Sequence, residues 1–371
     1  MSRHAIFESS TRYFLAPLLA FLDDDAVTEI MVNGPTEIYV ERAGRLEKTS
    51  AQFNSEDALR SAIHNIAQWV GREIDDSRPV LDARLPDGSR VHAIIPPSAR
   101  NGTCLTIRKF SREARSLADL VRLNSLSEAA QEFLEICVLL RKNVLISGGT
   151  GTGKTVLLGA ITRAIPPEER IVVIEDTSEL QLMQPHVVYL EARHGGRDGH
   201  GGLTIRELFS NSLRMRPDRI IVGEVRGGEA LDMIQSMLSG HSGSLTTIHA
   251  SSPRDALIRL ETLSLMSDVE IPIHVAGMQV AAAIHLVVQI ARFQEDGSRK
   301  VTRIAEVRGL NEAGQFSVQD VFASKLVGRY VGGRLQAELA FTGLRPTFAD
   351  APKQEGIAHR IRASKELWEL D

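Results

Sequence analysis

Residues 144–155 read VLISGGTGTGKT, and this stretch decides the fold of the chain. Its first four residues predict a buried strand, and the turn after them fits the pattern G-x-x-x-x-G-K-[ST]. A helix is predicted to follow at once and to end before Pro166 and Pro167. A strand, a glycine-rich turn and a helix in direct succession are typical of a P-loop, in which backbone N–H groups and the helix N-terminus bind phosphate.

The residues of this loop have distinct expected roles. The glycines let the backbone approach the phosphates, Lys154 reaches the β and γ phosphates, and the Thr155 hydroxyl binds Mg²⁺. ATP is favoured over GTP because the chain has no Asn-Lys-x-Asp run of the kind that recognises guanine. The predicted ATP-binding residues of the loop are Gly148, Gly149, Thr150, Gly151, Thr152, Gly153, Lys154 and Thr155.

Acidic residues end two further predicted strands. Glu224 follows the apolar run 219–222, and Glu175 with Asp176 follows the run 171–174. At the carboxyl edge of a parallel sheet such acids bind Mg²⁺ or orient the attacking water. Glu224 is therefore predicted as a catalytic residue and metal ligand, acting through water because Gly223 replaces the aspartate usually found there. Glu175 is predicted as catalytic and Asp176 as nucleotide-binding. The alternative is that both are solvated acids at the start of a helix, where the helix dipole favours them.

Basic residues and one histidine complete the predicted site. His249 follows the strand predicted over 245–248, so it should hydrogen-bond the γ-phosphate unless it is a structural histidine. Arg214 and Arg216 precede the strand of Glu224, and Arg108 ends the last strand of the first domain. Phosphoryl transfer requires positive charge on the γ-phosphate, which these arginines could supply from a neighbouring element or subunit. The alternative is that they are surface charges in salt bridges.

The 371 residues, 43% hydrophobic and 24% charged, predict two domains with real cores. Residues 1–110 mix strands and a helix without βα alternation, which indicates a small α+β domain. Residues 111–124 are predicted as a linker, 125–350 as an α/β domain with a C-terminal β extension, and 351–371 as a tail. In the second domain, short apolar strands alternate with helices, which indicates a mainly parallel sheet covered on both faces.

The composition also limits location and partners. A net charge of −4 and no basic stripe argue against direct binding of nucleic acid. Two cysteines cannot form a disulfide framework, so a cytoplasmic setting is expected. Residues 271–291 lack charged residues but contain proline, histidine and glutamine, and we interpret them as a buried helix leading into a strand. No transmembrane segment is expected.

Together these motifs closely resemble those of the type II/IV secretion ATPases. The resemblance covers roughly residues 25–351 and is carried by the P-loop and the runs IEDTSEL (174–180), GEVRG (223–227) and GHSGSLTTIHA (240–250). Within this superfamily the runs SPRDAL (252–257), RLET (259–262) and TGLRP (342–346) are most similar to the CpaF (TadA) branch, which powers Flp-type, or tight-adherence, pili.

The resemblance implies a homohexameric ring ATPase that uses ATP and Mg²⁺. Each subunit would join a PAS-like N-terminal domain to a RecA-like ATPase domain, with nucleotide between them. The ring would lie in the cytoplasm on inner-membrane platform proteins and drive pilus assembly or retraction. Lys154 and Thr155 would bind phosphate and Mg²⁺, Glu224 would be the Walker B acid, Glu175 and Asp176 the Asp box, His249 the His box, and Arg108 would face the γ-phosphate.

Three alternatives stay open at this point. The first is a conjugation-type traffic ATPase of a type IV secretion system. The second is a RecA-like nucleic-acid motor, which the acidic total and only 5% aromatic residues disfavour. The third is a nucleotide-dependent scaffold that does not hydrolyse ATP, which the acids and arginines disfavour.

Overall fold

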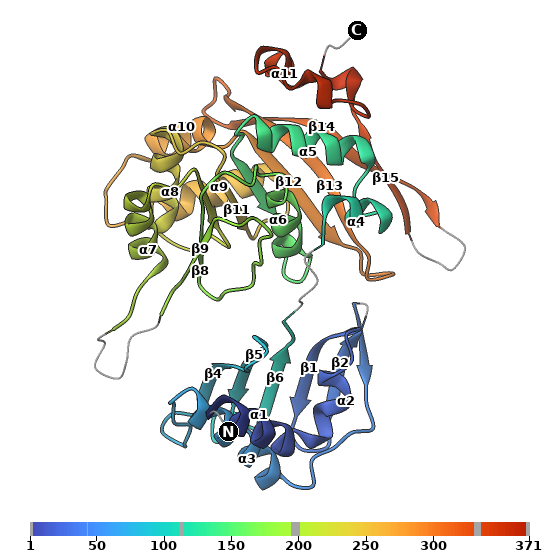
Figure 1. The fold of residues 1–371 in the computed structure, drawn as a ribbon, viewed down its shortest axis with the longest axis vertical. Coiled ribbons are helices and arrows are strands. Elements are labelled where there is room, and N and C mark those ends of the chain that lie inside the picture. The colour runs from blue at the N-terminus through green and yellow to red at the C-terminus, as the bar shows by residue number, and fades with distance from the viewer. Residues whose placement is uncertain (1–2, 43, 111–114, 194–200, 330–334, 369–371) are drawn as a thin grey trace. The chain divides into compact units, whose positions relative to one another are not determined.

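The computed structural model describes residues 3–42, 44–110, 115–193, 201–329 and 335–368 (Figure 1). The chain forms two compact units, Met1–Arg112 and Glu113–Asp371. Each unit has its own hydrophobic core, and the second has one on each face of its sheet. The fold is a RecA-like ATPase domain preceded by a smaller α+β domain, as the sequence predicts.

The first unit is built on an antiparallel sheet of six strands in the order β3-β2-β1-β6-β5-β4. Residues alternate between buried and accessible along these strands, so one face of the sheet forms the core. The strands are β1 Val27–Asn33, β2 Ile38–Arg42, β3 Arg45–Lys48, β4 Val80–Arg84, β5 Arg90–Ile94 and β6 Cys104–Arg108.

Helix α3, Glu56–Trp69, contributes the helical side of this core. The Ser55 side chain caps it by accepting a hydrogen bond from Ala58 N, and its apolar residues recur at helical spacing. Two N-terminal helices, α1 Arg3–Phe14 and α2 Leu19–Leu22, precede β1. Helix α1 was not predicted from the sequence. It packs through Phe7, whose ring centroid lies 4.1 Å from that of Trp69, and these two residues are far apart in the sequence.

The second unit contains a nine-stranded sheet in the order β15-β14-β13-β12-β7-β11-β10-β8-β9. The strands from β12 to β9 are parallel, and β13, β14 and β15 add an antiparallel extension. Their bounds are β7 Val144–Ser147, β8 Ile171–Glu175, β9 Val187–Glu191, β10 Arg219–Val222, β11 Leu245–Ile248, β12 Leu286–Arg292, β13 Arg299–Leu310, β14 Phe316–Arg329 and β15 Leu335–Phe341.

Helices cover both faces of this sheet (Figure 1). The four central strands β7, β8, β10 and β11 are buried along their whole length, which explains their continuous apolar sequences. One face is covered by α4 Leu117–Arg122, α5 Glu128–Leu139 and α6 Lys154–Thr162. The other is covered by α7 Ile205–Ser212, α8 Glu229–Leu238, α9 Pro253–Ser264 and α10 Ile273–Ala283.

Two segments predicted as connectors are structured. Within the predicted linker, residues 117–122 form α4, whose Leu117 and Leu120 are buried in the core of the second unit. Within the predicted tail, α11, Ala351–Gln354, is followed by Trp368, which is fully buried and stacks on Phe133. Neither segment has a long apolar run, so their sequences give little sign that these side chains complete a core.

Residues 271–291 form helix α10 followed by strand β12, as predicted. The helix is apolar but only partly buried: Ile273 and Met278 are exposed, whereas Ala276 and Val280 lie in the core. Among the described residues, no helix has both the length and the apolar character needed to cross a membrane.

Candidate nucleotide site

The loop from Gly148 to Gly153 joins the carboxyl end of β7 to the first residue of α6. At its start the backbone lies against β12, so that a Cβ on Gly148 would come 2.5 Å from the carbonyl oxygen of Ile290. At its end Gly153 has a φ of 95°, which only glycine adopts readily. The loop conformation therefore requires glycine at both positions.

Lys154 is the first residue of α6 and is buried. Its Nζ donates a hydrogen bond to Gly149 O at 3.0 Å and lies 3.3 Å from Nδ1 of His249. The side chain of Thr152 also donates to Gly149 O, at 2.9 Å. The ammonium group is thus held over the loop, where P-loop proteins bind phosphate.

Glu224 and His249 meet beside this lysine, because β10 and β11 are parallel neighbours whose carboxyl ends lie at the same edge of the sheet. The distance from His249 Nε2 to Glu224 Oε1 is 2.7 Å, without hydrogen-bond geometry. The other oxygen, Oε2, accepts a hydrogen bond from Arg226 at 2.7 Å. Arg226 Nη1 also lies 3.8 Å from Asp176 Oδ2. Cations and carboxylates therefore alternate across the site.

The imidazole of His249 is held in its neutral form. Burial, and next the positive charge of Lys154, lower the pKa of His249 below its ordinary value, although Glu224 opposes this effect. The bond to Glu224 raises the pKa of Arg226, which keeps its charge. Neutral His249 can both donate and accept a hydrogen bond at neutral pH.

Glu175, the last residue of β8, is buried next to Gly223. Its Oε1 accepts hydrogen bonds from Glu179 N at 2.9 Å and Leu180 N at 3.1 Å, so it holds the turn that follows the strand. Burial raises the pKa of Glu175 to about 7. A Cβ on Gly223 would lie 2.8 Å from Glu175 Cγ, which explains why aspartate is absent from that position.

Arg214 and Arg216 do not join this site within one chain. They are exposed and precede the amino end of β10, whereas the P-loop follows the carboxyl end of β7. Because the two strands run parallel in one sheet, these ends lie at opposite edges. Strand direction thus separates Arg214 and Arg216 from Glu224, although they are close in sequence. Their action from a neighbouring subunit stays a prediction.

The first unit carries a row of three arginines that sequence reasoning identified only in part. Arg108 pairs with Arg90 across β6 and β5, and Arg90 pairs with Arg84 across β5 and β4. Arg108 also lies opposite Glu29 across β6 and β1. Only the strand register reveals Arg84 and Arg90. The role of Arg108 toward a phosphate stays a prediction.

The side chains at the edge of the second unit's sheet fit a nucleotide with Mg²⁺. Oxygen atoms of carboxylate and hydroxyl groups are the ligands that Mg²⁺ prefers. Thr155 is the second residue of α6 and is partly accessible. Glu224 Oε1 is buried and accepts no hydrogen bond from any described residue, so it can take a bound water or ion.

Comparisons with known proteins identify relatives of this chain. A family model described as "Type II/IV secretion system protein" matches residues 14–331. A putative conjugal transfer protein of Mycobacterium tuberculosis is 36% identical over 301 residues, which cover 79% of this chain and 84% of that protein. VirB11, a type IV secretion system protein of Brucella suis, is 33% identical over 326 residues, covering 81% and 90%. The X-ray structure of the Legionella pneumophila ATPase DotB has the same fold, with a TM-score of 0.57, 21% identity and coverage of 78% and 79%.

Proposed function

Because this chain belongs to the type II/IV secretion system protein family, we propose that it hydrolyses ATP to drive a machine of that family. The observation that carries the proposal is the meeting of Lys154, Glu224 and His249 at the carboxyl edge of three parallel strands. A buried cation over a P-loop with a carboxylate beside it is what phosphoryl transfer to water requires.

In this reaction water attacks the γ-phosphorus and the bond to the β–γ bridging oxygen breaks, releasing ADP. Lys154 and the loop amides neutralise the phosphate charge, and Glu224 orients the attacking water. Thr155 and Glu224 would hold Mg²⁺, which supplies further positive charge to the phosphates. His249, neutral and between Lys154 and Glu224, hydrogen-bonds the γ-phosphate. Glu175 and Asp176 support this edge, Glu175 by its turn and Asp176 through Arg226.

Further positive charge comes from the arginines. We expect Arg108 to bind phosphate oxygens through its planar guanidinium group. Arg214 and Arg216 would contribute from a neighbouring copy of the chain in the homohexameric ring that we propose. The ring would lie in the cytoplasm, attached to the inner membrane through platform proteins.

Two machines are compatible with this activity. The sequence resemblance to the CpaF branch favours assembly or retraction of a Flp-type pilus. The conjugal transfer and type IV secretion relatives favour a conjugation-type traffic ATPase instead. Deleting the gene and complementing it with wild type or Lys154→Ala decides between them: loss of surface pili supports the first machine, and loss of DNA or protein transfer with pili intact supports the second.

The test of ATP hydrolysis is Glu224→Gln, which keeps the shape of the side chain but removes its charge. Turnover should fall by roughly 10²-fold or more while the Kd for ATP stays within about threefold. Glu128→Gln, an exposed acid at the start of α5, is the matched control and should behave as wild type. Wild-type turnover in the Glu224 variant would contradict the assignment. Stimulation of turnover by added DNA would instead favour a nucleic-acid motor, and failure of the wild-type protein to release phosphate would favour a scaffold.

A further inference from the structure

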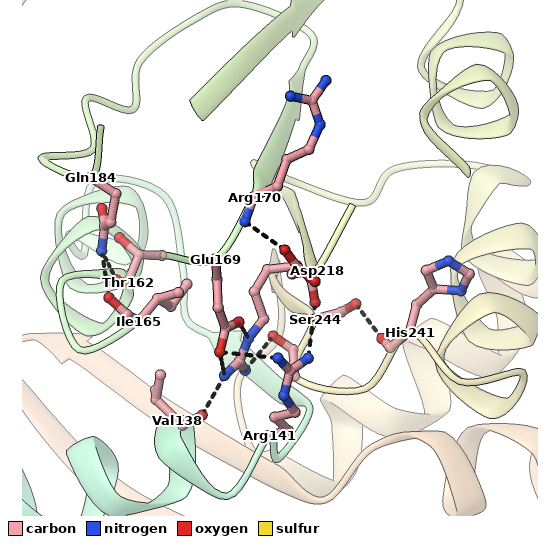
Figure 2. Close-up of polar contacts among 12 residues, drawn as sticks. Val138, Arg141, Thr162, Ile165, Glu169, Arg170, Gln184, Asp218, His241 and Ser244 are labelled. Carbon is pink, nitrogen blue, oxygen red and sulfur yellow. Dashed lines mark hydrogen bonds and ion pairs between the residues drawn. The ribbon is translucent and has the colours of Figure 1, made fainter. Parts of the chain in front are cut away.

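A buried polar cluster lies at the amino ends of the strands that carry the site, at the edge opposite the P-loop. Its centre is Arg219, the first residue of β10, which is only 1% exposed. Arg219 Nε donates to Glu169 Oε2 at 2.6 Å, and Nη2 donates to Val138 O at 2.8 Å. Nη1 donates to Gly243 O at 3.2 Å. Figure 2 shows the polar contacts of this region, with Glu169, Val138 and Arg141 labelled.

Asn143, which precedes β7, is the second buried member of this cluster. Its Oδ1 accepts hydrogen bonds from Gly243 N at 2.7 Å and Ser244 N at 3.0 Å. Its Nδ2 donates to Ala283 O at 2.7 Å, before β12. Gly243 is therefore bound on both sides, its carbonyl by Arg219 and its N–H by Asn143.

Position 243 cannot accommodate a residue with a side chain. Its φ is 84°, and a Cβ would lie 1.8 Å from Arg219 Nη1. Strand β11 begins two residues later, at Leu245. The two buried side chains thus fix where β11 starts relative to β7 on one side and β10 on the other.

The same three strands end at the reactive residues. Strand β11 ends directly before His249, β10 ends two residues before Glu224, and β7 leads into the loop of Lys154. Strands of four residues span roughly 13 Å and are stiff, so a displacement of their amino ends also displaces their carboxyl ends. We infer that Arg219 and Asn143 are positioning residues that set the spacing of His249, Glu224 and Lys154.

The spacing matters because the contacts it controls are short. Nε2 of His249 is 2.7 Å from Glu224 Oε1, and Nδ1 is 3.3 Å from Lys154 Nζ. Hydrogen-bonding interactions weaken steeply beyond such distances, and a 1 Å misplacement of reacting groups can cost about 10²-fold in rate. The expected loss of turnover rests on the proposed ATP hydrolysis. The distances among His249, Glu224 and Lys154 are features of the structure and do not depend on that proposal.

The test is Arg219→Lys, which keeps the positive charge but cannot reach Glu169, Val138 and Gly243 together. Turnover should fall about 10-fold or more, with the Kd for ATP within about threefold of wild type. Arg141→Lys is the matched control, since Arg141 contacts the same Glu169 at 3.1 Å but donates to Asp218 O. It should keep wild-type turnover.

A second readout is independent of hydrolysis. Crystal structures of the variants give the distances from His249 Nε2 to Glu224 Oε1 and from His249 Nδ1 to Lys154 Nζ, which are 2.7 and 3.3 Å in the wild type. Arg219→Lys should lengthen at least one of them by about 1 Å, whereas Arg141→Lys should leave both unchanged. If Arg219→Lys does not fold, Asn143→Ser, too short to span its three partners, should give the same result.

Unchanged turnover and unchanged distances in the folded Arg219 or Asn143 variant would overturn the inference, as would equal losses in the Arg141 control. A wild-type protein that hydrolyses no ATP would overturn the proposed function instead, and the measured distances would still decide the positioning role.

Discussion

Replacing Glu175 with glutamine should stabilise the second unit at neutral and alkaline pH. The carboxyl is 4% exposed, and burial raises the pKa of Glu175 from the ordinary 4.5 to about 7. The Oε1 atom accepts hydrogen bonds from Glu179 N and Leu180 N, and glutamine offers the same carbonyl oxygen. The substitution therefore removes the cost of burying a charge and keeps the turn.

The sign and size follow from the two pKa values. Between pH 4.5 and about 7 the folded state binds a proton that the unfolded state has released, so the free energy of unfolding falls as pH rises through this range. A change from 4.5 to about 7 corresponds to about 3 kcal/mol once pH exceeds the upper value. Below pH 4.5 the variant and the wild type should be equally stable.

Urea unfolding between pH 4 and 9 measures this difference, with fluorescence as the signal. The chain has two tryptophans, and Trp69→Phe leaves only Trp368, which is buried in the second unit. Glu128→Gln, at an exposed acid, is the control and should show no pH-dependent difference. The reasoning would be refuted by a gain in the free energy of unfolding that does not change with pH, or by a variant that is less stable than wild type at pH 8.5.

Three further substitutions test other parts of the structure. Gly148→Ala would place a Cβ 2.5 Å from Ile290 O and should weaken ATP binding at least about 10-fold by calorimetry, whereas Gly159→Ala, with nothing nearer than 3.7 Å, should not. Glu132→Ala removes the carboxylate that accepts hydrogen bonds from the amides of residues 362–364, so the unit should lose about 2 kcal/mol and those amides should exchange faster with deuterium. Gly223→Asp introduces the aspartate usual beside Glu224, yet its Cβ would lie 2.8 Å from Glu175 Cγ, so steady-state turnover should fall and not rise.

The sequence predicted the elements of the second unit well, because its strands are short, apolar and punctuated by helix caps. The pattern Thr204-x-x-Glu207 predicts the capping box that begins α7, and the turn residues at 295–298 predict the hairpin that joins β12 to β13. The meeting of Glu224 and His249 could also be predicted, since both follow strands whose carboxyl ends share one edge.

What the sequence could not reveal depends on strand order and register. Arg219 stands with Arg214 and Arg216 in one run of basic residues, and nothing in the sequence distinguishes it from them. In the structure Arg219 is buried, whereas the other two are exposed. Its acceptors come from segments 24 to 81 residues away. The row of Arg84, Arg90 and Arg108 likewise exists only through the pairing of three strands.

The hydrogen bond from Arg299 Nε to Gly151 O, at 2.8 Å, has a mechanical consequence. Arg299 is the first residue of β13, a strand of 12 residues that pairs with β14, which in turn pairs with β15 at the sheet margin. A P-loop that changes shape at Gly151 must either break this bond or pull on β13. At about 4.8 Å per strand, the pull reaches β15 roughly 10 Å from β13, on the side of the sheet away from Glu224. The antiparallel extension is thus linked mechanically to the phosphate-binding loop through Arg299.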